Sequence, residues 1–308
     1  MKEGHDTQNA RSILLAIAAA VLYALSSPIS KLLLRDGDIP PTMLAGLLYI
    51  GAGAGMLIIY LISRLLKRKP NEQPVGRGDL RYIIAMVALD IAAPILLMLG
   101  LSSAAAANVS LLNNFEIVAT SLIALVVFKE AISKRLWAAI ALVTAASALL
   151  SFEDTSSLTF SWGSLLVIGA CICWGVENNC TRRLSSKDPM QIVVIKGFCS
   201  GTGSVAISLC VGERIGNGGA VPIALLLGFA AYGLSIFCYI YAQRRLGAAK
   251  TSAYYAVAPF IGAILSFIIF KEMPSVKFLI ALAIMAAGVY FASFDGKRAA
   301  KVDAAHEK

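Results

Sequence analysis

Carboxylates and amides lie in the middle of long apolar runs of this sequence. The clearest case is SLLNNFEIVATSLIALVVFKE at residues 110–130, whose centre holds Asn113, Asn114 and Glu116. A charged side chain at the centre of a bilayer costs about 2.5–3.5 kcal/mol on insertion scales, so such residues usually face the interior of a helix bundle or a wet cavity. These groups could bind a polar solute or carry a proton, provided that the runs around them cross a membrane.

Composition indicates that the runs do cross a membrane. Of the 308 residues, 58% are hydrophobic and 15% are charged, and the mean hydropathy is +0.76. A soluble domain has roughly 45–50% apolar and about 25% charged residues. The apolar residues form blocks of about 18 to 25, a length that fits a hydrocarbon core of roughly 30 Å at ~1.5 Å per residue. We therefore predict an all-α integral membrane protein.

Ten transmembrane helices are predicted, joined by connections too short for a separate soluble domain. The first span follows basic residues but has no A-x-A site that would mark it as a cleaved signal peptide, so we expect it to be retained. The spans are expected at residues 12–34, 41–63, 81–100, 104–128, 135–152, 161–181, 190–211, 220–243, 250–270 and 275–294.

Basic residues are distributed unevenly among the connections. If the N-terminus is inside, 21 of the 27 Lys and Arg residues fall in inner segments and 5 in outer ones, and Lys196 lies within a span. This bias follows the positive-inside rule and predicts cytoplasmic tails at residues 1–11 and 295–308. The net charge of +9 is therefore a topology signal, and no nucleic acid partner is expected.

The two halves of the chain repeat each other. VVFKEAISKRLWAAIALVTAASALLSFED aligns without a gap with IIFKEMPSVKFLIALAIMAAGVYFASFDG, and YALSSPISK at 23–31 matches WGVENNCTR at 174–182. We therefore expect two five-helix repeats, residues 12–152 and 161–294. Because five is odd, the repeats must enter the membrane in opposite directions, which gives an inverted repeat with a binding site near the midplane.

These features resemble the drug/metabolite transporter (DMT) superfamily, in particular its EamA-type ten-span members. The resemblance covers residues 12 to 294 and implies a secondary transporter. It implies export of a metabolite, amino acid or drug-like solute across the bacterial cytoplasmic (inner) membrane by alternating access. Besides the duplication and the span count, the resemblance rests on the motifs Trp174-Gly175…Arg182, its weaker counterpart Tyr23-Ala24…Lys31, and Pro259…Glu272.

One position departs from the repeat. The first half has Ile117 where the second has Pro259, and Glu116 where the second has Ala258. The two halves have therefore diverged at the polar centre of the fourth span.

Glu116 belongs to a polar stripe. At helical spacing Asn113 precedes it by three residues, Thr120 follows it by four, and Ser110 lies a turn further back, so all four share one face. Exposure of these polar side chains to lipid would be unfavourable, so we expect the face that carries them to line a cavity. We expect a substrate or proton site here; the alternative is interhelical hydrogen bonding by the amides without a transport role.

The sixth span carries a second polar group. Glu177 and Asn178 match Ser26 and Ser27 of the first span across the repeat, so we expect Ser26, Glu177 and Asn178 to approach the centre from the two halves. Glu177 lies only about 9 Å of helix rise from the inner end of its span. A gate or a salt bridge is therefore as plausible a role as a substrate contact.

Two further ionisable residues lie well inside spans. Asp90 is at the middle of the third span, four residues before Pro94, which frees the Asp90 carbonyl. We expect Lys196 to extend towards the inner interface, with an ion pair to one of the carboxylates as the alternative. A carboxylate without a partner in a low-dielectric setting tends to take up a proton, so Glu116 or Asp90 is the candidate for coupling export to proton entry.

Aromatic residues and glycines complete the prediction. GAGAG at 51–55 and GFCSG at 197–201 predict close helix packing. Aromatic side chains are expected to wall a cavity or to lie at the membrane interface: Tyr23, Trp174, Tyr232, Tyr239, Tyr254 and Tyr255.

No enzyme is predicted. The spans contain no histidine, no HExxH and no GxSxG, and Asp90 is the sole aspartate at a span centre, so we expect no catalytic residue, metal or cofactor. A membrane-embedded enzyme, a non-transporting membrane protein, and an importer or uniporter of the same fold are the alternatives. The expected partners are a small solute, the lipid bilayer and, in the coupled version, protons. Monomer and homodimer both fit the sequence.

Overall fold

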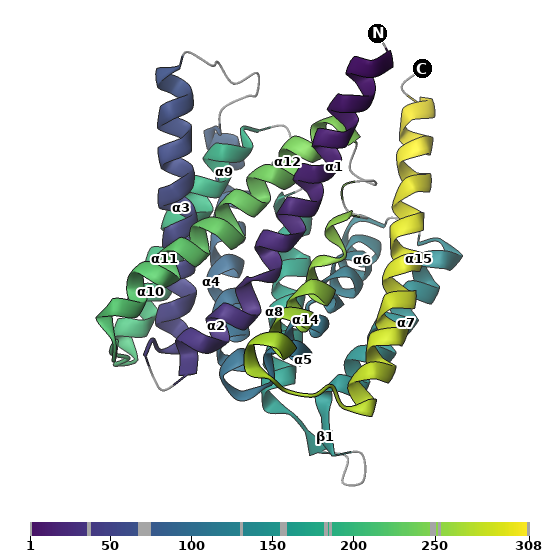
Figure 1. Ribbon diagram of the computed structural model, residues 1–308. Coiled ribbons are helices and arrows are strands. Elements are labelled where there is room, and N and C mark those ends of the chain that lie inside the picture. The colour runs from purple at the N-terminus through teal and green to yellow at the C-terminus, as the bar shows by residue number, and fades with distance from the viewer. Residues whose placement is uncertain are drawn as a thin grey trace.

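The protein is a helix bundle with one short β-hairpin at one end (Figure 1). The structure is a computed structural model that describes residues 2–35, 38–66, 75–129, 132–154, 159–181, 184, 187–246, 251 and 254–306. Each predicted span contains helix, so the all-α class follows directly from the apolar blocks.

The first half of the chain forms seven α-helices. They are α1 (Lys2–Ala24), α2 (Ser26–Leu34), α3 (Pro41–Leu65), α4 (Leu80–Ser103, preceded by the 3₁₀ turn η2, Arg77–Asp79), the pair α5 (Ala106–Leu112) and α6 (Phe115–Phe128), and α7 (Lys134–Ser151).

The hairpin and the second half follow. They comprise β1 (Phe152–Asp154), β2 (Thr159–Phe160), α8 (Trp162–Thr181), α9 (Pro189–Ile195), the π-helical turn η4 (Lys196–Ser200), α10 (Gly201–Cys210), the 3₁₀ turn η5 (Gly218–Ala220), α11 (Val221–Gly228), the π-helical turn η6 (Phe229–Leu234), α12 (Ser235–Leu246), α14 (Ala258–Phe270) and α15 (Val276–His306).

Among the described residues, seven helical segments are long and apolar enough to cross a membrane, and two shorter apolar helices cover Ala258–Phe270 and Val276–Ala292. Helix α8 has 20 residues, but it ends in the polar sequence Glu177-Asn178-Asn179, which lowers its hydropathy. The membrane class is therefore clear, and the count of ten spans stays a prediction.

Three predicted spans are interrupted in the described residues: the first and the fourth divide into separate helices, and the ninth has a turn at Ala256–Val257 before α14. The first span divides at Leu25, where Pro28 removes a backbone donor and its ring opposes the carbonyl of Ala24. The fourth span divides at Asn113–Asn114, so the polar stripe predicted on one continuous helix lies across a break. By contrast, α4 continues through Pro94.

The ends of the chain also differ from the prediction. Helix α1 begins at Lys2 and α15 continues to His306, beyond the apolar blocks. The extension of α15 is rich in alanine, which favours helix. The predicted connection after residue 152 contains the β-hairpin, in which Phe152 is opposite Phe160.

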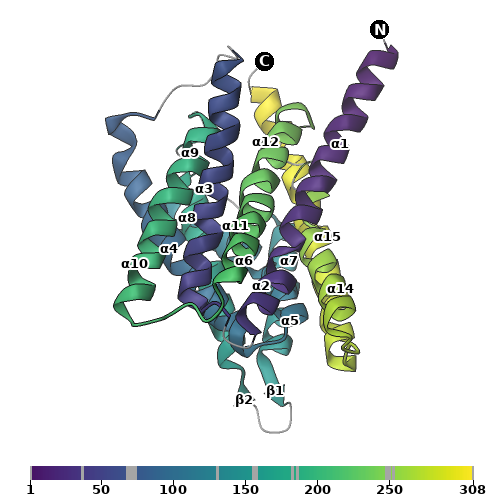
Figure 2. The same ribbon diagram turned by 60° about the vertical axis from the view of Figure 1, so that its left-hand side comes forward.

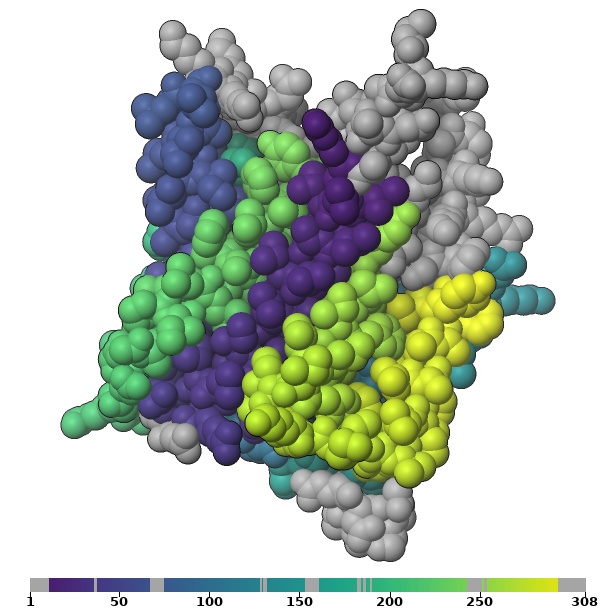
Figure 3. Space-filling model, in the orientation of Figure 1, coloured from purple at the N-terminus to yellow at the C-terminus, as the bar shows by residue number. Residues whose placement is uncertain are grey.

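The two repeats run in opposite directions. Helix α1 starts at the end of the bundle where both termini lie, whereas α8 starts beside the hairpin at the opposite end (Figures 1 and 2). Helix packing follows the same relation: α4 packs on α8 as α12 packs on α1, and α6 packs on α8 as α14 packs on α1. In the repeat, α1 corresponds to α8, α4 to α12 and α6 to α14, so exchanging equivalent helices turns the first contact of each pair into the second. In the space-filling view, α1 crosses one face diagonally between α12 and α14 (Figure 3).

The repeat extends to backbone conformation. Lys129 and Lys271, which are equivalent in the alignment, both end their helices in the left-handed region with φ 54°. They are the two non-glycine residues with positive φ in the described part of the chain. The same uncommon helix end has therefore been kept in both halves.

Glycines permit the closest contacts between the halves. A Cβ atom on Gly51 would lie 2.1 Å from the carbonyl oxygen of Leu225, and one on Gly228 would lie 2.0 Å from that of Leu48. Gly197 meets Gly53 in the same seam, where an added Cβ would lie 2.3 Å from the Gly53 Cα. The close packing predicted from GAGAG and GFCSG is confirmed. It brings α3 of the first half against α11 and η4 of the second.

We predict that Gly51→Ala destabilises the protein by about 1–3 kcal/mol, because the added methyl group meets backbone that cannot rotate away. Gly169→Ala is the matched control, since its nearest neighbour would be the flexible Leu96 side chain at 3.5 Å. Thermal unfolding of both variants in detergent, followed by intrinsic fluorescence, checks this. Equal unfolding midpoints for the two variants would contradict it.

Candidate functional site

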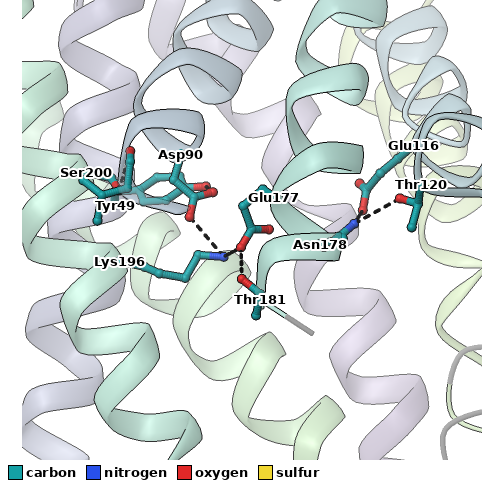
Figure 4. A network of polar contacts seen from close by, with 10 residues as sticks. Tyr49, Asp90, Glu116, Thr120, Glu177, Asn178, Thr181, Lys196 and Ser200 are labelled. Carbon is teal, nitrogen blue, oxygen red and sulfur yellow. Dashed lines mark hydrogen bonds and ion pairs between the residues drawn. The ribbon is translucent and has the colours of Figure 1, made fainter. Parts of the chain in front are cut away.

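The polar residues of the membrane interior gather on two sides of the last turns of α8 (Figure 4). One group contains Lys196 and two carboxylates, and the other contains Glu116 and amides. We call them the ion cluster (Tyr49, Asp90, Glu177, Thr181, Lys196) and the amide cluster (Glu116, Thr120, Asn178, Asn179).

The ion cluster joins one cation to two carboxylates. Lys196 Nζ lies 3.1 Å from Asp90 Oδ2 on α4 and 3.0 Å from Glu177 Oε1 on α8. The Lys196 side chain is 17% exposed, against 0% for Asp90 and 3% for Glu177. The expectation that Lys196 extends to the interface is wrong: its ammonium group forms ion pairs with both carboxylates, which is the alternative that the sequence left open.

Hydroxyl groups complete the ion cluster. The Tyr49 hydroxyl on α3 donates to Asp90 Oδ1 at 3.1 Å, and Thr181 Oγ1 donates to Glu177 Oε1. Thr181 lies one turn after Glu177 on α8, whereas Tyr49 was not among the residues selected from the sequence. The cluster therefore ties α3 and α4 of the first half to α8 and η4 of the second.

The amide cluster also links the two halves. Asn178 Nδ2 donates to Glu116 Oε1 at 2.6 Å and lies 3.4 Å from Thr120 Oγ1. Asn179 Nδ2 donates to the carbonyl oxygens of Gly175 at 2.8 Å and Thr120 at 3.1 Å. Gly175 makes this approach possible, because a Cβ there would lie 2.6 Å from that of Ala119. Glu116, Thr120 and Asn178 all remain partly exposed.

The break in the fourth span lies beside Glu116. Asn114 Nδ2 donates to the carbonyl oxygen of Leu111 at 3.0 Å and so satisfies one acceptor at the break. Two other polar atoms of the predicted stripe, Asn113 Oδ1 and Ser110 Oγ, are buried and have no hydrogen-bond partner among the described residues. Irregular backbone inside a membrane protein is tolerated where it is buried in protein or lines a cavity.

Tyrosine rings form a continuous series near the clusters. The ring centroids of Tyr49 and Tyr232 are 5.7 Å apart, those of Tyr232 and Tyr23 6.0 Å, those of Tyr23 and Tyr255 5.6 Å, and those of Tyr255 and Tyr239 5.1 Å. The series draws two rings from the first half and three from the second. Its first ring reaches the ion cluster through the hydroxyl of Tyr49.

Other predicted residues lie outside the two clusters. Ser26 is buried at the start of α2, and within the described residues no hydrogen bond joins it to Glu177 or Asn178. Trp174 is buried in α8 one turn before Asn178. Tyr255, rather than its neighbour Tyr254, contacts Tyr23. Arg182, which carries part of the motif in the sixth span, lies outside the described residues.

One signal in the sequence could have selected Tyr255. The gapless alignment of the fourth spans sets Asn113 opposite Tyr255, so both residues occupy the same position of the repeat. The π-helical turn η4, which begins at Lys196, left no comparable signal. Such turns are rare and often occur at functional sites.

We predict that Lys196→Met destabilises the protein by about 3–5 kcal/mol, because it leaves two buried carboxylates without their cation. The triple variant Lys196→Met/Asp90→Asn/Glu177→Gln should recover much of this loss, since no buried charge remains. Unfolding midpoints of both variants in detergent check the prediction. A triple variant no more stable than the single variant would show that the ion cluster is not held by charge.

Comparison with known proteins gives matches along most of the chain. Two copies of the model described as the EamA-like transporter family match residues 10–152 and 161–294. An uncharacterized transporter of Methanothermobacter thermautotrophicus (strain Delta H) is 25% identical over 298 residues, which cover 91% of this chain and 85% of that protein. The uncharacterized transporter YyaM of Bacillus subtilis (strain 168) is 21% identical over 226 residues, covering 70% and 72%.

A crystal structure shares the fold. It superposes with a TM-score of 0.64 at 18% sequence identity and covers 94% of this chain and 98% of its own. At this level of identity the likeness concerns the arrangement of the helices alone.

Proposed function

The chain belongs to the EamA-like transporter family, and on this premise we propose that it is a secondary transporter that exports a small metabolite, amino acid or drug-like solute by alternating access. The observation that carries the proposal is the hydrogen bond between Glu116 and Asn178. It joins the two repeats through polar side chains that remain partly exposed. In transporters built from inverted repeats, the substrate site lies between the repeats and uses broken helices.

The proposal includes a topology. Ten spans arranged as two inverted five-helix repeats would cross the cytoplasmic membrane, with both termini in the cytoplasm. The shared end of the two termini and the opposite directions of α1 and α8 support this arrangement (Figure 1). Lys and Arg are in excess in the segments expected at that end, which supports a cytoplasmic location for it.

Glu116 is the better candidate of the two carboxylates for proton coupling. Asp90 already has Lys196 at 3.1 Å and the Tyr49 hydroxyl at 3.1 Å. Glu116 has an amide donor, and among the described residues no cation lies within 4 Å of it. A carboxylate in this setting can become neutral by taking up a proton, and it can release that proton when water reaches it from the other side. Uniport with Glu116 in a purely structural role is the alternative.

We predict that cells expressing the wild type enrich one class of compound in spent medium relative to empty vector, and that Glu116→Gln abolishes the enrichment. Glutamine keeps the size of the side chain and removes the charge. Glu272→Gln is the matched control, because Glu272 is an exposed carboxylate near the outer end of α14. Comparative metabolite profiling checks this. Equal export by Glu116→Gln would make Glu116 a packing residue, and a wild type that matches the vector would contradict export.

We predict that an imposed pH gradient, acid outside, accelerates export by the wild type and has little effect on the double variant Glu116→Gln/Asp90→Asn. The variant has no carboxylate left at either candidate position to carry a proton. Vesicles loaded with the exported compound and moved to media of different pH provide the measurement. If the double variant kept its full response to the gradient, proton coupling through these residues would be refuted.

A further inference from the structure

The polar residues inside the bundle share a single described cation. Lys196 is in contact with both Asp90 and Glu177, so its charge already serves two carboxylates. Glu116 receives a hydrogen bond from Asn178 at 2.6 Å, but a neutral amide does not balance a negative charge. Because an ionised carboxylate removed from water needs a cation beside it, the arrangement leaves a place for one next to Glu116.

The neighbouring polar atom is an acceptor. Asn113 Oδ1 lies in the break of the fourth span, three residues before Glu116, and it is buried without a partner among the described residues. Asn113 is 8% exposed. Leaving a buried acceptor without a donor is unfavourable, and a ligand that carries N–H donors would remove that cost. A protonated amine would suit both residues, because it supplies a positive charge for Glu116 and N–H donors for Asn113 Oδ1.

Two electron-rich rings lie on elements that pack beside the break in the fourth span. Helix α14, which begins three residues after Tyr255, packs on α5, which ends just before Asn113, and on α1, which carries Tyr23; the ring centroids of Tyr23 and Tyr255 are 5.6 Å apart. Tyr23, Tyr255 and Tyr239 are partly exposed, so their rings are open to contact. A cation within about 6 Å of the centroid of a tyrosine ring is attracted by the face of that ring, and ammonium groups are common ligands of such rings.

We propose that the solute is an organic amine, bound in its protonated form with its ammonium group between Glu116, Asn113 Oδ1 and the rings of Tyr23 and Tyr255. This assignment names the substrate class of the proposed transporter and rests on that function. Solutes whose only charge is a carboxylate or a phosphate are disfavoured, because such groups need Lys or Arg, and Lys196 is already shared by two carboxylates.

Three probes of similar shape test the proposal: 2-phenylethylamine, 2-phenylethanol and 3-phenylpropanoate. Their binding to the purified full-length protein in lipid nanodiscs at pH 7 is measured by isothermal titration calorimetry. We expect the amine to bind about tenfold or more tightly than the alcohol, which corresponds to about 1.4 kcal/mol, and the carboxylate to bind no better than the alcohol. Similar affinities for amine and alcohol, or tighter binding of the carboxylate, would overturn the proposal.

Variants locate the binding site. Glu116→Gln should weaken amine binding about tenfold or more, whereas Glu272→Gln should leave it unchanged. Unchanged amine binding by a folded Glu116→Gln protein would overturn the assignment. If that variant does not fold, the comparison of the three probes on the wild type decides alone.

The test separates this inference from the proposed function, because binding is measured without transport. Amine-selective binding in a protein that exports nothing would support the amine site and refute export. Export of a compound that lacks an amino group, with no preference for the amine probe, would support export and refute the amine site.

Discussion

An ionised side chain in the middle of a bilayer needs an opposite charge beside it, and this requirement organises the centre of the protein. Lys196 supplies the opposite charge for two carboxylates, and its contacts join α4, α8 and η4 at one point. The same arrangement leaves the third carboxylate, Glu116, with amide and hydroxyl neighbours. One described cation, shared by two of the three carboxylates, therefore gives a closed charge cluster on one side of α8 and leaves an accessible carboxylate, Glu116, on the other.

A second requirement acts on the backbone, since each polar group of the main chain must find a partner away from water. The helices depart from regular geometry near the polar centre: at Leu25, at Asn113–Asn114 and in the π-helical turns η4 and η6. The chain repairs one of these breaks itself, because Asn114 donates to the Leu111 carbonyl. The side-chain oxygen of Asn113, the next residue back, has no hydrogen-bond partner among the described residues. In the proposed site, Asn114 would hold the break and Asn113 would present an acceptor to the solute.

Much of this arrangement could be predicted from the sequence, because apolar block length and the internal repeat depend only on the order of residues. The helix at each span and the close glycine packing followed from block length and spacing. The partner of Lys196 could not be predicted, since it depends on how α4, α8 and η4 are rotated about their axes. Tyr49 was missed for the same reason: which face of α3 meets α4 is set by the glycine contacts of α3 with η4 and α11. The extra residue of a π-helical turn has no reliable pattern in sequence.

The repeat explains why the polar centre is asymmetric. Inverted repeats allow the same helices to pack in two related ways, which gives a transporter two states of similar energy. A bound group shifts the balance between two such states only by the difference in its affinity for them. Equivalent side chains in both halves would make that difference small. Here Glu116 is opposite Ala258, Asn113 is opposite Tyr255, and Glu177 is opposite Ser26. The carboxylate and the ring on which an ammonium group would depend thus come from non-equivalent residues, so exchanging the roles of the two halves changes the surroundings of the cation. In the proposed cycle, this divergence lets the cation, proton or ammonium, favour one state over the other.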